Sequence, residues 1–593
     1  MRPPRVRLTY GVSTGGAVEQ RELPFLIGVL ANLSGDRPDG AAQPPLAQRP
    51  MIDIDRDSFD AVMAQIAPRV ALTAARLADP ELAALLGDDT ELTLPAIAAF
   101  EPMAIVHALP SLRQRHGWRT QLRTLQARAE ADDGLDATLG AWVAALARGE
   151  PAEPSVMQNV SIDPAVQTFA ARWIPELVAA GAPGPFVVLD GLVARIDTQL
   201  SAALSGVMHG ARFRQLEASW RGLYQLVMNT ETGPLLMLRV LDATRDELHD
   251  DLAHAAGIDQ GTLFKRLYAA ACGTFGGIPY SLLVGDYAIG HGPDDLDFVS
   301  RMAEVAAAMH APFIAQASAA MFGLERFDAP GQPDLAASAG GPDAPSWRAF
   351  RDTDAARYVA LALPRVLMRL PYGAPGQPDT IACEGMLFDE HADAGPLWGN
   401  PAYLLAGRIT HAFALYGWPA AIFGADGGGR VDGLPGAAAS PPRSTEAAID
   451  LHAAHALAGL GFVPLARMAG GGRFAFVGVP AGHAHGAATL PRLLAASRFA
   501  LYVKVIVRAM IGSFMTRANL EQELDTWLAG YVLLDDTAAP AINASFPLRA
   551  AHAAVTELPG APGAYRVTLF LQPHFQLESL TASIRLVVDL PGG

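Results

Sequence analysis

The chain has 593 residues, of which 51% are hydrophobic and 18% are charged. A chain of this length folds into about two to four packed units, and this composition excludes disorder as its general state. It carries 44 Lys and Arg against 60 Asp and Glu, a formal charge of −16. Because an acidic surface repels phosphate backbones, we expect no nucleic-acid partner.

The cysteines and the hydropathy pattern indicate the cellular compartment of the protein. Cys272 and Cys383 are the two cysteines and form no Cys-x-x-Cys pair, which argues against a disulfide framework. The N-terminal stretch has no apolar signal segment, and no run reaches the roughly 18 apolar residues of a membrane span. We expect a cytoplasmic protein that is not inserted into a membrane.

The first hundred residues predict short strands and one helix. Residues 5–12 alternate as a half-buried strand does, and residues 23–31 form a continuous apolar run typical of a buried strand. Residues 35–50 are rich in Pro, Gly and Asp and predict a loop. A helix is expected from residue 57 to 66, before Pro68, and residues 91–95 predict a third strand.

The next region is helical. Residues 103–148 have a helical pattern that is interrupted near residues 132–134. Residues 149–156 predict a linker, so we place a boundary there. Residues 164–180 and 186–206 predict two further helices. The expected organisation is therefore a first region at 1–148, the linker at 149–156 and a second region at 157–593.

Beyond residue 206 the hydrophobic period changes repeatedly between helix and strand, which indicates α/β layers. Thr244 and Glu247 form a capping-box pattern at the start of one helix. The expected helices are 212–227, 244–255 and 294–309, and the expected strands are 235–241, 281–284, 565–571 and 581–590. We therefore expect a multi-domain α/β protein with mixed sheets flanked by helices. Strands at the two ends of a chain are often sheet edges, which invite pairing with neighbours.

No motif indicates catalysis. The glycine-rich segment Gly424–Gly433 lacks the Lys and Ser/Thr of a phosphate-binding loop, so a tight structural turn is favoured. The pairs His452/His455 and His483/His485 have no third ligand close by, as zinc would require. No nucleophile elbow is visible. We expect no catalytic residue, no cofactor and no metal.

Several stiff segments instead carry Arg and aromatic residues beside glycine turns, a composition suited to packed interfaces or cores. Taken in order, they resemble the large sheath protein of the type VI secretion system, TssC or VipB. The matching stretches are SWRGLYQLV (219–227), GTFGGIPYSLLVGDY (273–287), AAAMHAPFIAQAS (306–318), RYVALALPRVLMRLPYG (357–373), LWGNPAYLLAGRI (397–409), LPRLLAASRFALYVKVIVRAMIGSFM (490–515) and YRVTLFLQPHFQLESLTASIRLVVDLP (565–591).

The first region resembles the small sheath protein of the same system, TssB or VipA. The matching stretches are RVRLTYGVSTGGAVEQRELPFLIGVLANLSG (5–35), RPMIDIDRDSFDAVMAQIAPRVAL (49–72) and AFEPMAIVHALPSLRQ (99–114). The chain thus looks like a fusion of small and large sheath subunits, with the predicted linker near the join.

The resemblance implies a contractile-tail-sheath-like fold and a structural, non-enzymatic function. Such proteins self-assemble into a cytoplasmic helical sheath around a tube of stacked Hcp rings, and contraction ejects that tube. The implied partners are further copies of the chain, Hcp and baseplate components, with a ClpV-type recycling ATPase as a further candidate. The large subunit normally carries an N-terminal extension recognised by ClpV, and here the match follows the linker closely.

In this family, terminal strands pair with sheets of neighbouring protomers. The residues that we expect in such pairing are Arg5, Val6, Leu8, Tyr10, Ile584, Leu586 and Val588. A local basic face within residues 497–517 could meet an acidic inner ring, and internal ion pairs are the alternative for its members. These inner-tube-facing candidates are Arg498, Lys504, Arg508 and Arg517.

The sequence leaves two other functions open. One is a sheath-derived protein that assembles without contracting. The other, from a different class, is a nucleotide- or metal-dependent enzyme that uses Gly424–Gly433 or His452 and His455.

Overall fold

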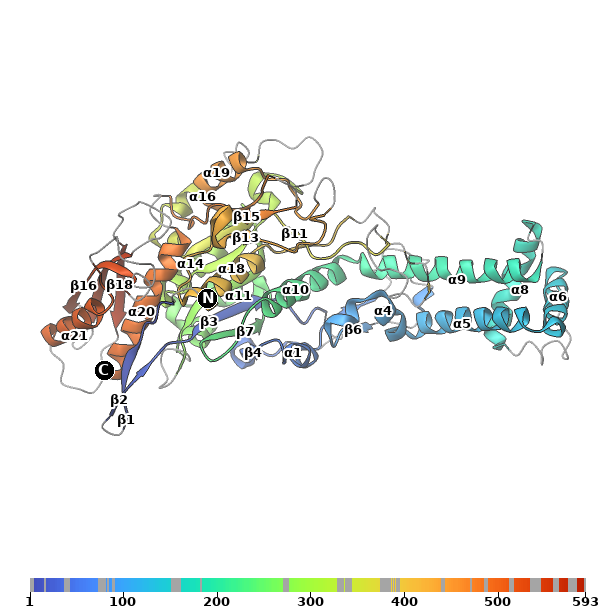
Figure 1. Ribbon diagram of the computed structural model, residues 1–593, viewed down its shortest axis with the longest axis horizontal. Coiled ribbons are helices and arrows are strands. Elements are labelled where there is room, and N and C mark those ends of the chain that lie inside the picture. The colour runs from blue at the N-terminus through green and yellow to red at the C-terminus, as the bar shows by residue number, and fades with distance from the viewer. Residues whose placement is uncertain are drawn as a thin grey trace.

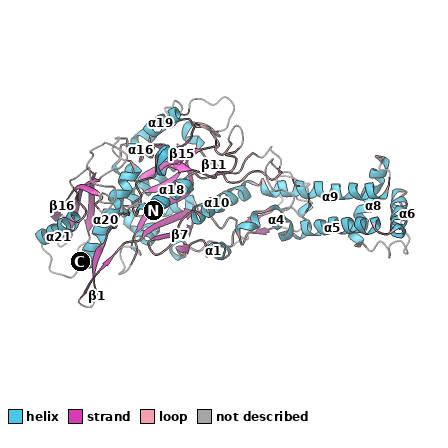
Figure 2. Ribbon diagram, viewed as in Figure 1, coloured by secondary structure: helices cyan, strands magenta, loops and turns pink. Residues whose placement is uncertain are grey.

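The computed structural model comprises a broad body and a long helical rod that projects from it (Figure 1). Helices form the rod, whereas the body combines a large central sheet with helices on both faces (Figure 2). The structure describes residues 5–14, 17–36, 43–72, 82, 85–87, 91–150, 162–181, 184–269, 277–327, 335, 344–373, 385–386, 388, 390, 395–438, 443–469, 472–484, 489–510, 517–533, 546–557, 565–573 and 584–590.

Within the described part of the chain, the central sheet of the body has nine strands in the order β13-β15-β14-β10-β9-β8-β3-β7-β4. The six strands from β14 to β7 are parallel to one another, and β4, β15 and β13 join antiparallel at the two ends. The bounds are β3 (Phe25–Ala31), β4 (Ile52–Ile54), β7 (Leu236–Asp242), β8 (Tyr280–Ile289), β9 (Phe313–Ala317), β10 (Val359–Leu363), β13 (Arg430–Val431), β14 (Phe462–Arg467) and β15 (Phe474–Phe476).

Strand β3 confirms the prediction from the apolar run at residues 23–31. All seven of its residues are buried, because it lies between β7 and β8 with helices on both faces. Ile27 and Val29 belong to one apolar layer, whereas Leu26 and Leu30 belong to the other. This alternation fills both faces of a parallel sheet. Strands from the first region, β3 and β4, are thus built into a sheet whose other strands come from the second.

Helices cover both faces of this sheet. α10 (Ala211–Met228) and α18 (Ala402–Tyr416) contribute Trp220 and Tyr403 to the first apolar layer. α14 (Pro293–Met309) and α20 (Leu490–Met510) contribute Phe298 and Phe499 to the second. The remaining body elements are α11 (Arg245–His254), α12 (Thr262–Phe264), α16 (Ala344–Arg351), α19 (Leu451–Gly459) and the strand pair β11 (Val366–Leu367) and β12 (Trp398–Gly399). The capping box at Thr244 and Glu247 is confirmed.

Among the described residues, five helices form the rod, and they correspond to the predicted helical region and the two helices after it (Figure 1). Asp132 explains the predicted interruption, since its side chain accepts hydrogen bonds from the backbone N–H groups of Gly134 and Leu135 and caps a new helix. Residues 151–161, which include most of the predicted linker, lie outside the described residues. The helices are α4 (Pro102–Ala108), α5 (Pro110–Glu130), α6 (Asp133–Ala147), α8 (Pro164–Ala179) and α9 (Pro185–Met208).

The root of the rod and the termini carry the smaller elements. α1 (Phe59–Ile66) ends before Pro68 as expected, and β5 (Arg69–Ala71) pairs with β6 (Glu91–Thr93). β1 (Tyr10–Thr14) and β2 (Ala17–Arg21) form a hairpin, so the first strand begins later than predicted. The C-terminal sheet has the order β16 (Leu548–Glu557), β17 (Tyr565–Pro573) and β18 (Ile584–Leu590), beside α21 (Arg517–Ala529). Within the described residues, no helix combines the length and apolar character that spanning a bilayer requires.

Candidate functional site: assembly edges and a charged joint

The N-terminal segment 5–9 is bound to the body of its own chain. The N–H of Val6 donates to the carbonyl of Tyr416 at 2.7 Å, and the Tyr502 hydroxyl donates to the carbonyl of Leu8 at 2.5 Å. The Trp527 indole N–H donates to the carbonyl of Thr9 at 2.9 Å. The side chains of Val6 and Leu8 are buried. They lie in the core of their own chain, and pairing of this segment with a neighbouring protomer stays a prediction.

The open edge at this end begins at Tyr10. β1 and β2 pair only with each other, from Tyr10↔Arg21 to Thr14↔Ala17. The hairpin projects from the body (Figure 1). Two contacts hold its root in place. The Tyr10 ring meets the Tyr502 ring edge-on with 6.0 Å between the ring centres, and Arg5 forms an ion pair with Glu22 at 3.7 Å. Each strand of the hairpin therefore has one side without a strand partner in the described chain.

The open edge at the C-terminal end is β18. This strand pairs antiparallel with β17, and Ile584, Leu586 and Val588 lie opposite Leu571, Leu569 and Val567. The sheet order places β18 last, with no described strand beyond it. Pairing of this edge with a neighbouring protomer stays a prediction.

The four cationic candidates lie in different environments. Arg498 is only 4% exposed, and its guanidinium donates to the carbonyls of Pro24, at 3.0 Å, and Leu23. It lies 5.1 Å from the centre of the Phe413 ring, and burial lowers its pKa. It holds the entry to β3 in place. Within the described residues its hydrogen bonds go to backbone carbonyls rather than to a carboxylate, and its contact with an inner tube stays a prediction.

The other three candidates are more accessible. Lys504 is partly buried, donates to the carbonyl of Ala308 at 2.8 Å and lies 4.9 Å from the centre of the Tyr268 ring. Arg508 is partly buried near the end of α20, and Arg517 is exposed at the start of α21. Contact of these side chains with an inner tube stays a prediction.

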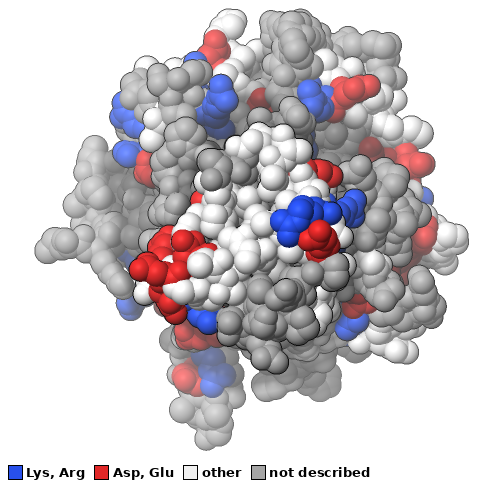
Figure 3. All heavy atoms as spheres, turned by 90° about the vertical axis from the view of Figure 1, so that its right-hand side faces the viewer, with Lys and Arg blue, Asp and Glu red and all other residues white. Residues whose placement is uncertain are grey.

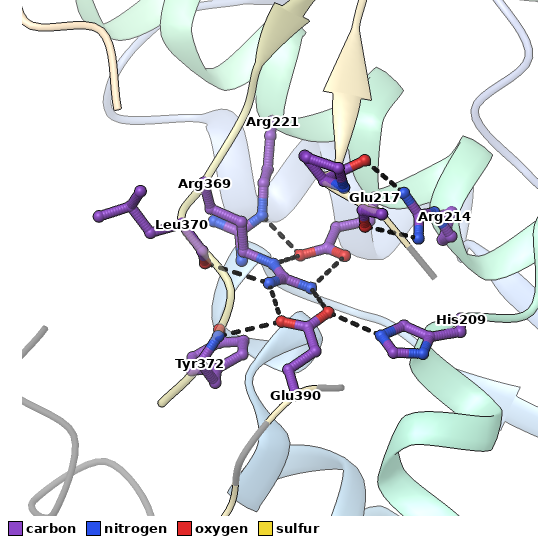
Figure 4. A network of polar contacts seen from close by, with 10 residues as sticks. His209, Arg214, Glu217, Arg221, Arg369, Leu370, Tyr372 and Glu390 are labelled. Atoms are coloured by element: carbon purple, nitrogen blue, oxygen red, sulfur yellow. Dashed lines mark hydrogen bonds and ion pairs between the residues drawn. The ribbon is translucent and has the colours of Figure 1, made fainter. Parts of the chain in front are cut away.

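A buried charged network joins the rod to the body (Figure 4). Only His209 and Gly210 separate α9 of the rod from α10 of the body. The carboxylate of Glu217 accepts from Arg221 at 2.8 Å and from Arg369 at 2.7 Å. Arg369 also donates to Glu390 at 2.6 Å, and His209 Nε2 lies 3.1 Å from the same carboxylate. We call these five residues the charged joint.

Electrostatics couples the members of the charged joint. Burial alone would raise the pKa of Glu390, but hydrogen bonds from His209 and Arg369 and the Arg369 charge outweigh it and lower the pKa to about 2. Burial would lower the pKa of Arg369, but the two carboxylates raise it instead. Desolvation offsets part of the attraction in a buried network of this kind, but the loss of one partner leaves an uncompensated buried charge. The joint therefore fixes how α10 meets the segment after β11.

Sequence reasoning identified the segments around Arg221 and Arg369 but not their shared partner. In the sequence, the residue that could have revealed this partner is Glu217. It lies four residues after Phe213 and three before Trp220, on the apolar face of α10, and Arg221 follows at i+4. An acid on an apolar helix face is stable only with a buried cation as partner, and here its side chain is 0% exposed.

Three residues behind the enzyme alternative, Gly428, Gly429 and His455, make close contacts within their own chain. A Cβ at Gly428 or Gly429 would overlap the carbonyl oxygens of Ala421 and Phe476 respectively, so the chain's own backbone requires these glycines. His455 contacts the carbonyl of its own helix residue Leu451 at 2.6 Å. Among the described residues, no three His, Cys, Asp or Glu side chains converge as metal ligands would; His485 lies outside them.

Comparison with known proteins gives ordered matches along the chain. The family described as VipB, EvpB/VC_A0108, tail sheath N-terminal domain, matches residues 190–483. Its tail sheath gpW/gp25-like domain matches residues 482–590. The family described as type VI secretion system, VipA, VC_A0107 or Hcp2, matches residues 1–147.

Individual relatives agree with this division. The chain is 39% identical over 431 residues to the type VI secretion system sheath protein TssC1 of Pseudomonas aeruginosa, covering 68% of this chain and 86% of the relative. It is 32% identical over 135 residues to the type VI secretion system sheath protein TssB1 of the same organism, covering 23% of this chain and 75% of the relative.

Among solved structures, a chain of the anti-feeding prophage baseplate is similar with a TM-score of 0.32 and 13% identity, over 62% of this chain and 81% of that one. This likeness is too weak to carry a conclusion. The sequence matches do carry one, since a small-sheath and a large-sheath sequence follow each other in a single polypeptide. The chain belongs to the type VI secretion system sheath family, as a fused structural subunit of the contractile sheath.

Proposed function

We propose that one copy of this chain acts as a complete sheath subunit. It polymerises in the cytoplasm into a hollow helical sheath around an Hcp-type inner tube and ejects that tube by contraction, without catalysis. The observation that carries the proposal is the shared sheet, in which β3 of the small-sheath region lies between β7 and β8 of the large-sheath region. Regions 1–148 and 157–593, joined by the linker at 149–156, are then sequence units rather than separately folding domains.

The assembly contacts that we propose are the two open edges. The β1–β2 hairpin and β18 both offer unpaired backbone N–H and C=O groups, which gain hydrogen bonds when a strand of another chain is added. Two different edges that meet between copies make a heterologous contact, and repetition of such a contact generates a helical polymer. The family resemblance supports baseplate components and a ClpV-type ATPase as further partners of this polymer.

Electron microscopy of the purified chain, alone and co-expressed with its inner-tube protein, tests the proposal. The sharpest variant replaces residues 12–19 with Asn-Gly, which closes the opposed pair Gly11 and Gln20 with a two-residue turn. Residues 5–10 and their contacts remain. We expect the wild-type chain to form hollow cross-striated rods and the shortened hairpin to leave small particles.

The matched control removes two charges from the hairpin but keeps its full length. Glu19 and Arg21 form an exposed ion pair at 2.7 Å, and such pairs contribute about 0–1 kcal/mol. The double variant Glu19→Gln and Arg21→Gln should therefore form rods of normal length. Circular dichroism checks that the shortened variant is folded. Rods of unchanged length from a folded, shortened hairpin would exclude strand addition at this edge.

We further propose that Lys504, Arg508 and Arg517 contact the inner tube. Arg517 is exposed, so charge reversal there should not disturb packing, and it would weaken attraction to an acidic ring. The Arg517→Glu variant should retain severalfold less inner-tube protein per sheath chain in purified rods, with a larger loss at low salt. Arg128→Glu, at an exposed site on the rod, is the control. An unchanged ratio of tube to sheath would exclude contact through Arg517.

A further inference from the structure

The C-terminal sheet has two edges, and other parts of the chain occupy the edge formed by β16. β16 and β18 are the outer strands of this sheet, and no described strand follows β18. α21, in contrast, lies along β16 (Figure 1). At the start of β16, the N–H of Leu548 donates to the carbonyl of Tyr531 at 3.1 Å, and its carbonyl accepts from the N–H of Leu533 at 2.8 Å. The two edges therefore differ in what they offer to another chain.

Two carboxylates of α21 occupy the next part of the β16 edge. The N–H of Ala553 donates to Asp525 at 2.7 Å, and the N–H of Val555 donates to Glu521 at 3.3 Å. Asp525 also contacts Nδ1 of His552 at 3.0 Å. In an antiparallel pair, the N–H groups of alternate residues point away from the partner strand. The two bound N–H groups are therefore donors that an added strand would require.

The spacing of the helix matches that of the strand. Residues four apart in a helix rise about 6 Å, and residues two apart in a strand rise about 7 Å. One turn of α21, from Glu521 to Asp525, thus reaches two successive outward N–H groups of β16. Apolar packing keeps the helix in this position, because three of its leucines belong to the same buried layer as the strand: Leu520, Leu524 and Leu528.

An incoming strand would have to displace both carboxylates. Hydrogen bonds to a charged acceptor are stronger than those between neutral backbone groups. Glu521 and Asp525 are half-buried, so losing their donors would leave two charges poorly compensated. The exchange of a carboxylate for the carbonyl of another strand is therefore unfavourable at β16.

We propose that Glu521 and Asp525 close the β16 edge, so that the C-terminal sheet accepts a strand of another copy only at β18. A sheet with one open edge takes one strand and is then complete, whereas two open edges allow sheets to join one after another. The closure of β16 stands on contacts within one chain, and the assignment of β18 as the accepting edge rests on the proposed function. The two acids thereby favour an ordered polymer over irregular association.

Two double variants of the full chain, which lose the same charge, test the proposal. Glu521→Ala with Asp525→Ala removes both acceptors, whereas Glu521→Gln with Asp525→Asn keeps a carbonyl oxygen at each position. Sedimentation collects the assembled protein, and negative-stain electron microscopy divides it into rods and irregular clusters. We expect severalfold more protein in irregular clusters for the Ala variant than for the Gln and Asn variant, which should resemble the wild-type chain.

The outcomes separate this proposal from the proposed function. Equal amounts of irregular clusters in the two double variants would overturn the closure of β16. The absence of rods from the wild-type chain would count against the proposed function alone, because clusters are compared between variants whether or not rods form. Circular dichroism shows whether each variant is folded. If the double Ala variant is not, Glu521→Ala and Glu521→Gln replace the two double variants, with the same criterion applied to the N–H of Val555.

Discussion

At the scale of single residues, buried arginines show how this chain keeps charge inside. Arg369 meets two carboxylates, Glu217 and Glu390, at 2.7 and 2.6 Å. Arg498 meets backbone carbonyls and aromatic rings, including Phe413, instead. A buried cation requires compensation of one kind or the other. The free energy of unfolding therefore depends on pH through the carboxylates that surround Arg369. The carbonyls and rings around Arg498 do not titrate and add no such dependence.

Acid should weaken the charged joint through Glu390. Its pKa falls from the ordinary 4.5 to about 2 in the folded chain. A depressed folded pKa contributes stability above the unfolded value, and this contribution is lost as pH falls from about 4.5 to about 2. The contribution is about 3 kcal/mol. Urea unfolding at pH 6, 4.5 and 3 should show the wild-type free energy falling across this range, and the Glu390→Gln variant should be less stable at pH 6 with a shallower fall.

A matched control separates Glu390 from general acid effects. Glu150 pairs with Arg148 on the surface, where both side chains are more than half exposed, and such a pair contributes little. Glu150→Gln should therefore reproduce the wild-type dependence on pH. If Glu390→Gln also reproduces it, the carboxylate does not stabilise the joint in the way that we describe.

At the scale of elements, α10 depends on a close approach to α18. Gly222 is buried on α10, and a Cβ there would overlap the Tyr403 ring of α18, with Cε2 only 2.7 Å away. The indole N–H of Trp220, two residues earlier, donates to the carbonyl of Leu33 just beyond β3 at 3.0 Å. The helix is thereby fixed both to the sheet and to its neighbouring helix, and the charged joint lies on the same helix.

Two glycine substitutions with opposite expected signs test this packing. Gly222→Ala should lower the free energy of unfolding by about 1–3 kcal/mol, because overpacking outweighs the gain in helix propensity. At Gly117 in α5, nothing lies within 4 Å of an added Cβ. Gly117→Ala should therefore raise the free energy of unfolding by about 0.5–1 kcal/mol. Urea unfolding measures both. A stabilising Gly222→Ala would show that α10 and α18 are not closely packed.

At the scale of the whole molecule, shape and charge govern assembly. Seen along the rod, the described side chains at its end are largely uncharged, with an acidic cluster on one side and a basic group beside an acidic one on the other (Figure 3). The chain as a whole carries a charge of −16. Copies of one acidic chain repel each other, and screening reduces that repulsion over distances beyond a Debye length. Polymer formation by this chain should therefore depend on salt.

The yield of polymer should rise between about 10 and 150 mM NaCl, where the Debye length falls from about 30 to 8 Å. Sedimentation of assembled protein measures this yield. Sucrose at matching osmolality, which does not screen charge, should not raise the yield to the same extent. A yield that stays flat or falls with salt would mean that attractive ion pairs, rather than net repulsion, dominate the contacts between copies.

The sequence by itself determined the elements and the family. The continuous apolar run of β3, the capping box of α11 and the break at Asp132 are local patterns, and each produced the predicted element. Local patterns suffice because periodicity and caps act within a few residues. The ordered sheath-like stretches indicated a fused sheath subunit, and the family matches confirm it.

Only the tertiary structure decided which distant segments meet. A fully buried apolar strand suits any central position of a parallel sheet, so sequence could not place β3 between β7 and β8. Nor could it pair Arg369 with Glu217, 152 residues away, or turn Arg498 inward to the carbonyls before β3. Such contacts depend on the order of strands and the packing of helices, which non-local burial selects. The same packing placed the carboxylates of α21 along the edge of β16.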